Sequence, residues 1–407
     1  MDLILKNART GATGDGLVDI GITGGRIVAI ESDLVAAGET LDVGGCLVSP
    51  GFVETHIHLD KSCIMDRCRA ERGDLAEAIE EVAKAKRGFT PEDVYARAKR
   101  SVEKAIAHGT THMRTQLEID PVVGLKGLEG VLPLIAEYKW AIDIEICVFP
   151  QDGLLNLPGT EDLMRQALTR GASVVGACPY TDSDPIGQID RVFAMAREFD
   201  RDIDMHLDFD LMPDETMINA VCKQTAAFRY GGRVTVGHVT RLSAMPPEQR
   251  ERAARRMADA GVALIVMPST DLYLMGRTDT HNVPRGMAPA HDLLGHGVNC
   301  AISTNNVLNP FTPYGDGSLI RMANLYANVA QIGTASQLRD CFDMVTTRSA
   351  RLMNLENYGL HVGARADLVV LDCATPQQAI AELAPVLYAF KHGRRTVTRL
   401  RPALHRS

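Results

Sequence analysis

The sequence predicts an α/β protein, with a (β/α)8 barrel and a small β-sandwich domain built from both ends of the chain. In the middle of the 407 residues, apolar or β-branched runs alternate with helical patterns eight times. These alternations take up about 250 residues, the usual size of such a barrel. At both ends, short strand patterns alternate instead with glycine turns. The alternative is a doubly wound open sheet, but no GxGxxG motif follows a strand candidate, and eight units favour closure.

The two ends of the chain predict the sandwich. Near the start, strands are expected at residues 3–5, 18–22 and 26–30, with turns at 11–16 and 24–25. Near the end, strands are expected at residues 366–371, 386–390 and 395–398, with a turn at 392–393. Because the termini of a domain often lie close together, we expect residues 1–50 and 357–407 to form one composite domain and residues 51–356 to form the barrel.

The barrel is predicted from eight strand candidates. They are residues 47–58, 110–119, 141–149, 173–180, 202–209, 233–239, 262–269 and 298–305. Helical patterns lie between them at residues 75–87, 90–107, 190–199 and 247–260. The second of these begins with Thr90, a residue that caps helices well, followed by Pro91, which suits the first helical position.

Composition narrows the class of protein. The formal net charge of −8 argues against nucleic acid or an anionic membrane as the main partner. No apolar run reaches the roughly 18 residues of a membrane span, and the N-terminus does not resemble a secretory signal. The nine cysteines form no CxxC motif, so we expect mostly buried, reduced thiols in a cytoplasmic protein.

The positions of the histidines are the most informative feature of the sequence. His56 and His58 end the first strand candidate, His206 lies in the fifth and His238 in the sixth. Because side chains alternate along a strand, His56 and His58 point to the same face. Barrel enzymes carry their active sites at the carboxyl ends of the strands. Each histidine alone could be incidental or part of the core, but together they predict a pocket for one divalent metal ion, Zn²⁺ or Fe²⁺.

The other eight histidines are expected to be structural. They are His108, His112, His281, His291, His296, His361, His392 and His405.

The segment PGFVETHIHLD, residues 50–60, resembles the first-strand signature of the amidohydrolase superfamily, and within it the cytosine deaminase branch. That branch includes hydrolases of s-triazine breakdown. Further matching segments follow in the same order along nearly the whole chain. They are residues 149–153 (FPQDG), 237–238 (GH), 276–277 (GR), 309–311 (NPF) before Gly315, 357–360 (NYGL) and 363–368 (GARADL).

The resemblance implies roles for individual residues. His56, His58 and His206 match the metal ligands of the family, and His238 matches the histidine that orients or polarises the attacking water. The fourth strand candidate contains no lysine to bridge two ions, which implies one metal.

Three polar residues are expected to contact the substrate: Gln151, Arg277 and Asn306. Gln151 matches a side chain that hydrogen-bonds the substrate ring in the family. Arg277 lies in the segment of residues 273–285, which is expected to close over the ligand.

Two departures from the family pattern change the expected chemistry. Asn305 stands where the family usually has an aspartate that takes a proton from water, and an amide cannot serve as a general base. Phe209 stands where cytosine deaminase has a glutamate that shuttles a proton to the ring. Asp208 and Asp210 flank Phe209 and could replace that carboxylate, although structural roles are the expectation.

Two residues could then accept the proton. One is His238 and the other is Lys61, which follows the HxH segment closely and would need a lowered pKa. The alternative for Lys61 is a structural ion pair with Asp60 or another nearby acid. Catalytic roles are therefore expected for His238, Lys61 and Asn305.

Together these observations predict a one-metal hydrolase of C–N bonds other than peptide bonds. Its substrate would be a small N-heterocycle, from which it removes ammonia or an alkylamine. Two alternatives stay open: hydrolysis of a cyclic amide or thiocarbamate, and a degenerate protein that only binds its ligand. The resemblance also implies a homo-oligomer, for which the sequence shows no pattern of its own.

Overall fold

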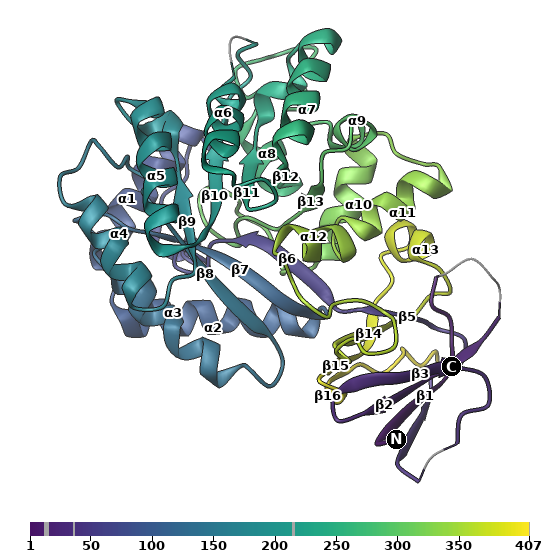
Figure 1. Cartoon of the computed structure of the whole chain (residues 1–407). Helices are drawn as coiled ribbons and strands as arrows, with labels where there is room; N and C mark the ends of the chain where they lie inside the picture. The colour runs from purple at the N-terminus through teal and green to yellow at the C-terminus, as the bar shows by residue number, and fades with distance from the viewer. Residues whose placement is uncertain (12–15, 36, 214–215, 407) are drawn as a thin grey trace.

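The computed structural model describes residues 1–11, 16–35, 37–213 and 216–406. Its centre is a parallel eight-stranded sheet in which each strand pairs with the next along the chain (Figure 1). The strands are β6 (Phe52–Ile57), β7 (Thr110–Glu118), β8 (Asp143–Phe149), β9 (Val174–Ala177), β10 (Asp202–Leu207), β11 (Val234–His238), β12 (Val262–Val266) and β13 (Cys300–Ile302).

The sheet closes just beyond its first and last strands. The backbone amide of Asn305 donates to the carbonyl of His56 at 2.9 Å, and the amide of His58 donates to the carbonyl of Asn305 at 2.8 Å. These two hydrogen bonds complete the ring of strands beside the predicted site. The predicted barrel is therefore confirmed, and the open sheet is excluded.

Helices surround the barrel and bury apolar side chains against its outer face (Figure 1). They are α1 (Leu75–Ala85), α2 (Pro91–Ala107), α3 (Lys126–Glu137), α4 (Thr160–Thr169), α5 (Pro185–Phe199), α6 (Ile218–Phe228), α7 (Pro247–Ala260), α8 (Pro268–Leu274), α9 (Ala290–Gly295), α10 (Leu319–Val329), α11 (Ala335–Asp343), α12 (Thr347–Leu352) and α13 (Pro376–Ala381). Thr90 caps α2 as predicted, since its side chain accepts a hydrogen bond from the amide of Asp93. Within the described residues, no helix is both long enough and apolar enough to cross a bilayer.

The first strand candidate, residues 47–58, is two strands rather than one. Its first part is β5 (Leu47–Pro50), which pairs with β14 outside the barrel, and its second part is β6. Gly51 separates them, at a point where a Cβ would lie 2.2 Å from Cγ2 of Thr111. The continuous apolar run signalled burial correctly, but it could not show that the chain passes from one sheet to another.

Strands from both ends of the chain form two further sheets, with orders β3-β2-β1-β4 and β16-β15-β14-β5. Their bounds are β1 (Leu3–Ala8), β2 (Val18–Thr23), β3 (Arg26–Glu31), β4 (Glu39–Asp42), β14 (Leu368–Leu371), β15 (Val386–Lys391) and β16 (Arg394–Thr398). One apolar core includes Leu5 and Ile20 from the first sheet with Leu368 and Phe390 from the second. The predicted sandwich is thus present, while most of the predicted turn at 11–16 lies outside the described residues. We propose residues 1–50 with 357–407, and 51–356, as the two domains.

A buried lysine joins the small domain to the barrel. Nζ of Lys391 donates to the carboxylates of Asp143 at 2.7 Å and Asp367 at 2.9 Å, and to the backbone carbonyl of Thr111 at 3.0 Å. His112 lies beside the two carboxylates, and burial lowers its pKa to about 3, so its ring is neutral. This group of donors could hold a metal ion by its geometry, but the ammonium of Lys391 already supplies the positive charge.

We expect Lys391→Met to lower the free energy of unfolding by about 3 kcal/mol, because it leaves the Asp367 carboxylate buried without its cation. The matched control is Lys84→Met, at an exposed lysine that pairs with Glu80 and Glu81, and we expect it to have a much smaller effect because water screens the pairs. Denaturant unfolding of the two variants measures the difference. Equal losses would contradict the assigned role of Lys391.

Candidate active site

Three histidine side chains meet inside the barrel. His56 and His58 come from β6 and the residue after it, and His206 comes from β10. Nε2 of His206 lies 3.2 Å from Nε2 of His56 and 3.1 Å from Nε2 of His58. Burial lowers the pKa of all three rings, so they are neutral and can offer nitrogen lone pairs.

This arrangement fits a bound cation. A neutral imidazole has a single N–H, so three Nε2 atoms facing one another cannot all be satisfied by hydrogen bonds among themselves. Neutral imidazole nitrogens are favoured ligands of zinc and of iron. The three residues form one of two groups of potential ligands found among the described residues, and the other is the group held by Lys391. The histidine group therefore fits a divalent metal ion, and its side chains are the ones named from the sequence.

Polar residues hold the back of the His56 ring. Its Nδ1 lies 3.3 Å from Nε2 of Gln116 and 3.5 Å from a carboxylate oxygen of Asp204. Burial raises the pKa of Asp204, but hydrogen bonds from His56 and Arg114 outweigh that effect and lower it. An ionised carboxylate behind a ligand histidine fixes the orientation of the ring. No sequence pattern indicated that Asp204 or Gln116 would lie behind the ring of His56.

His238, at the end of β11, is oriented by a buried acid. Its Nδ1 lies 2.6 Å from Oδ1 of Asp271, whose other oxygen accepts from the backbone amide of Met267 at 3.2 Å. The Asp271 carboxylate is placed to accept a hydrogen bond from Nδ1–H, which leaves Nε2 to face the pocket. Asp271 lies in α8, a short helix that no sequence pattern predicted, and so its role was missed.

Asn305 and Asn306 both line the pocket, directly after β13. The backbone of Asn305 has a φ of 63° and takes part in barrel closure. Its side-chain oxygen is buried and has no partner among the described residues, so it is free to accept a hydrogen bond from a ligand. The side-chain oxygen of Asn306 instead accepts from Asn309 at 2.7 Å.

Lys61 is held in an ion pair. Its Nζ lies 2.6 Å from Oε1 of Glu118 and 3.2 Å from Oε1 of Gln151. Burial raises the pKa of Glu118, but Lys61 and Lys86 outweigh burial and lower it to about 2. The partner is therefore an ionised Glu118 and not Asp60, whose carboxylate accepts from the backbone amide of Lys61. An ammonium has no lone pair that could accept a proton, so a lysine held in this ion pair is poorly suited to act as a general base.

Three other predicted candidates lie away from the pocket. Arg277 is exposed, and its guanidinium donates to the backbone carbonyls of Tyr273 at 3.0 Å and Arg72 at 2.8 Å. It therefore ties two loops together and does not line the pocket, contrary to expectation. Asp208 accepts hydrogen bonds from the hydroxyl of Thr216 and the backbone amide of Met217, and Asp210 pairs with Arg241, so neither replaces the carboxylate missing at Phe209.

The pocket itself is narrow, with a cavity volume of about 10 Å³. Phe209 and Phe311 provide flat apolar faces, and the Phe209 ring packs on His238 with centroids 4.0 Å apart. The lining residues are His58, Lys61, Gln151, Tyr180, His206, Phe209, His238, Thr270, Asn305, Asn306 and Phe311. The structure thus places His58, Lys61, Gln151, His206, His238, Asn305 and Asn306, all singled out from the sequence, around one cavity.

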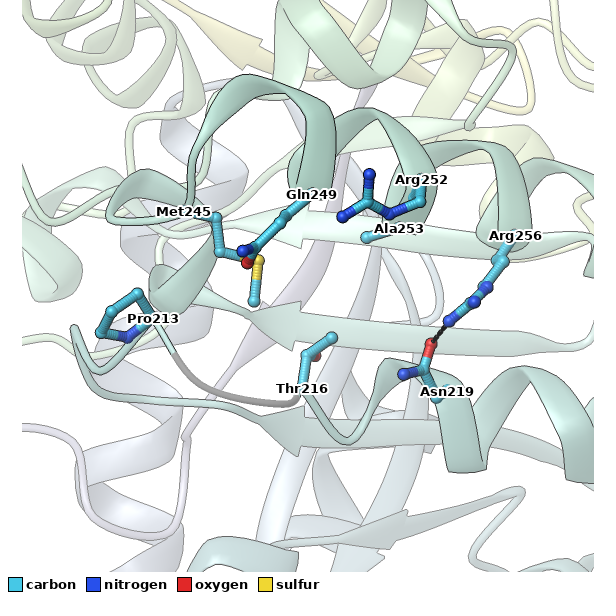
Figure 2. Close-up of a pocket in the computed structure, with 8 residues that line it drawn as sticks. All are labelled: Pro213, Thr216, Asn219, Met245, Gln249, Arg252, Ala253 and Arg256. Carbon is cyan, nitrogen blue, oxygen red and sulfur yellow. Dashed lines mark hydrogen bonds between the residues drawn. The ribbon is translucent and has the colours of Figure 1, made fainter.

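A second hollow lies on the surface between α6 and α7 (Figure 2). Arg252 and Arg256 lie along one side of it, and Arg256 donates to the side chain of Asn219. No group of potential metal ligands lies there among the described residues, and its arginines are exposed. The barrel pocket is therefore the candidate active site.

Comparison with known proteins agrees with this geometry. A model described as "Amidohydrolase family" matches residues 137–397. N-isopropylammelide isopropyl amidohydrolase from Pseudomonas sp. (strain ADP) is 32% identical over 402 residues, which cover 97% of this chain and 96% of that protein. Pterin deaminase from Rhizobium rhizogenes is 26% identical over 89% of this chain and 84% of its own length.

A solved structure is similar over the full length. The 5-methylcytosine deaminase from Klebsiella pneumoniae, liganded with 5-fluorocytosine, superposes with a TM-score of 0.94 at 27% identity and covers 99% of both chains. The shared fold, the family match and the full-length relatives confirm the resemblance found in the sequence. The chain belongs to the amidohydrolase family.

Proposed function

We propose that this chain is a one-metal hydrolase that removes ammonia or an alkylamine from a small N-heterocycle. The observation that carries the proposal is the convergence of three neutral histidine nitrogens beside an oriented fourth histidine, in a narrow pocket with aromatic faces. The relatives support the substrate class, since their names describe enzymes acting on ammelide, pterin and cytosine rings.

His56, His58 and His206 would hold the metal ion, and imidazole ligands suit both Zn²⁺ and Fe²⁺. A divalent ion in such a site supplies Lewis acidity, which lowers the pKa of bound water and polarises the bond under attack. One ion is proposed because β9 and the residues next to it contain no lysine that could bridge two. The nine free thiols support a reducing compartment, and we propose the cytoplasm.

The proton transfers are assigned to His238. Its Nε2 accepts a proton from the attacking water while the hydroxyl group bonds to the ring carbon, and Asp271 stabilises the imidazolium through Nδ1. His238 then returns the proton to the amine nitrogen as the C–N bond breaks. The products are the oxo heterocycle and ammonia or an alkylamine. Asn305 accepts a hydrogen bond through its free oxygen and positions the water, which is a role an amide can fill.

We expect the purified protein to contain about one zinc or iron ion per chain and to release ammonia or alkylamine from a panel of aminopyrimidines and aminotriazines. His206→Ala should lose both the metal and at least about 10³-fold in kcat/KM, because it removes a ligand. Elemental analysis and an ammonia assay measure the two effects. The control is His291→Ala, at a histidine stacked on Tyr326 outside the pocket, which should retain both. Unchanged turnover in His206→Ala, with no metal in either protein, would refute the proposal.

Asp271→Asn should lower kcat by about 10²- to 10⁴-fold with unchanged metal content, because the amide can stabilise the wrong tautomer of His238 and cannot balance an imidazolium. Asp208→Asn is the matched acid-to-amide control. Its carboxylate does not line the pocket, so we expect a change of only a few-fold. If both variants lose activity equally, Asp271 does not act through His238.

The rival function is a protein that binds a heterocycle without hydrolysing it, and Asn305 together with Phe209 favours it. Asn305→Asp decides between the two. If the chain is an enzyme, the wild type turns over a heterocycle, and the variant changes the rate and its pH dependence. If turnover is found only in Asn305→Asp, the natural chain is a degenerate enzyme and the proposed function fails.

A further inference from the structure

A groove on the surface lies where the barrel meets the small domain. It is formed by α2, the end of α3 and the edge strand β16, and its cavity volume is about 520 Å³. That volume falls within the range of roughly 300–1,000 Å³ that is usual for ligand pockets. Its larger apolar side chains and its two acids are Ile106, Tyr138, Trp140, Val397, Glu103 and Glu137. We call this hollow the Trp140 groove.

Trp140 is the feature that points to an interface. It is the only tryptophan in the sequence, and 57% of it is exposed. Its ring centroid lies 6.3 Å from that of Tyr138, so two large aromatic side chains stand together at the surface. Exposed aromatic residues beside an apolar hollow are typical of surfaces that bind another protein chain. The groove therefore needs an occupant with apolar side chains.

The segment that follows β16 has this character. Residues 399–406, which we call the tail, lie outside any helix or strand. Leu400 and Leu404 are 84% and 97% exposed, although both are large apolar side chains. The tail also contains three arginines and neither aspartate nor glutamate. It is thus an apolar and basic segment without an apolar contact of its own.

The charges of the groove complement those of the tail. Among the described residues that line the groove there are two glutamates and no lysine or arginine. Lys99 donates to Glu137 at 2.7 Å and neutralises part of its charge. Glu103 is exposed and accepts only from the neutral hydroxyl of Tyr138 in the described part of the chain. Glu103 is therefore the acid that an arginine of the tail can pair with.

The tail leads away from the groove of its own chain. The sheet has the order β16-β15-β14-β5, and the groove lies at its β16 edge. The amide of Arg399 donates to the carbonyl of Leu387 in β15 at 2.7 Å. The guanidinium of Arg401 then donates to Asp372, after β14, at 2.7 Å and to Sγ of Cys46, before β5, at 3.1 Å (Figure 1). The tail thus crosses toward the opposite edge of the sheet, and the leucines are left in solvent.

We propose that the tail of one copy of this chain docks in the Trp140 groove of a second copy. Leu400 and Leu404 pack against the aromatic and aliphatic side chains of the groove, and an arginine of the tail pairs with Glu103. Because each chain carries one tail and one groove, a two-fold axis lets the two copies exchange tails and closes the assembly as a dimer. This interface lies outside the barrel pocket and does not depend on the proposed chemistry.

Sedimentation of the full chain, together with the emission of its single tryptophan, tests the proposal. We expect the wild type to sediment with twice the mass of one chain. Dilution should dissociate it and shift the emission of Trp140 to longer wavelength, because the indole becomes exposed to water.

The double variant Leu400→Asp/Leu404→Asp should raise the Kd of the dimer at least about 10-fold, because it removes two apolar side chains from the interface. Trp140→Ser, which changes the groove instead of the tail, should weaken the dimer similarly. The matched control is Val362→Asp, at a valine that is 60% exposed and belongs to neither the tail nor the groove. It should leave the Kd unchanged.

A synthetic peptide of residues 398–407 examines the groove in the natural chain. In excess, it should convert the wild-type dimer to monomers while the emission of Trp140 stays at short wavelength, because the peptide takes the place of the partner's tail. The same peptide with both leucines replaced by aspartate should do neither.

The other outcomes overturn the proposal. One is a wild type that stays monomeric at every concentration, and another is a dimer whose Kd the tail and groove variants leave unchanged. A monomer whose emission shifts to longer wavelength in Leu400→Asp/Leu404→Asp would show that the tail fills the groove of its own chain, so a second copy is not the occupant. None of these measurements uses the metal or turnover, so the proposed function stands or fails separately.

Discussion

The site depends on three buried imidazole nitrogens that face one another at hydrogen-bond distance. Neutral rings with converging lone pairs are costly to bury unless something positive lies between them. Barrel closure imposes this arrangement, because the hydrogen bonds that join β6 to the segment after β13 involve the backbones of His56, His58 and Asn305. The fold and the site are therefore built by the same few residues, and neither can change much without the other.

The carboxylates of the site stand behind other residues and not in the pocket wall. Asp271 acts through His238, Glu118 holds Lys61, and Asp204 supports His56. This placement gives a physical account of the two departures from the family pattern, Asn305 and Phe209. With neutral side chains at both positions, the proton-accepting function is left to the His238–Asp271 pair, and the wall of the pocket is left with the positive charge of Lys61.

The sequence predicted the barrel, the sandwich and the positions of the histidines. Side chains alternate along each strand, and active sites of barrels lie at the carboxyl ends of the strands. Both patterns can be recognised within short stretches of chain. It could not predict Asp271, Asp204 or Glu118, because nothing local shows which acid will pack beneath which base. For the same reason, the sequence could not show which acid pairs with Lys61. The exposed position of Arg277 and the division of residues 47–58 between two sheets depend on tertiary packing, which an apolar run or a GR pair does not encode.

If the three histidines bind one cation, anomalous diffraction from crystals of the purified protein should locate it. Data collected on both sides of the zinc and iron absorption edges should show a single strong peak, within about 2.0–2.2 Å of Nε2 of His56, His58 and His206. A map with no peak among these rings, from protein shown to be active on a heterocycle, would mean that the three histidines do not hold a metal ion.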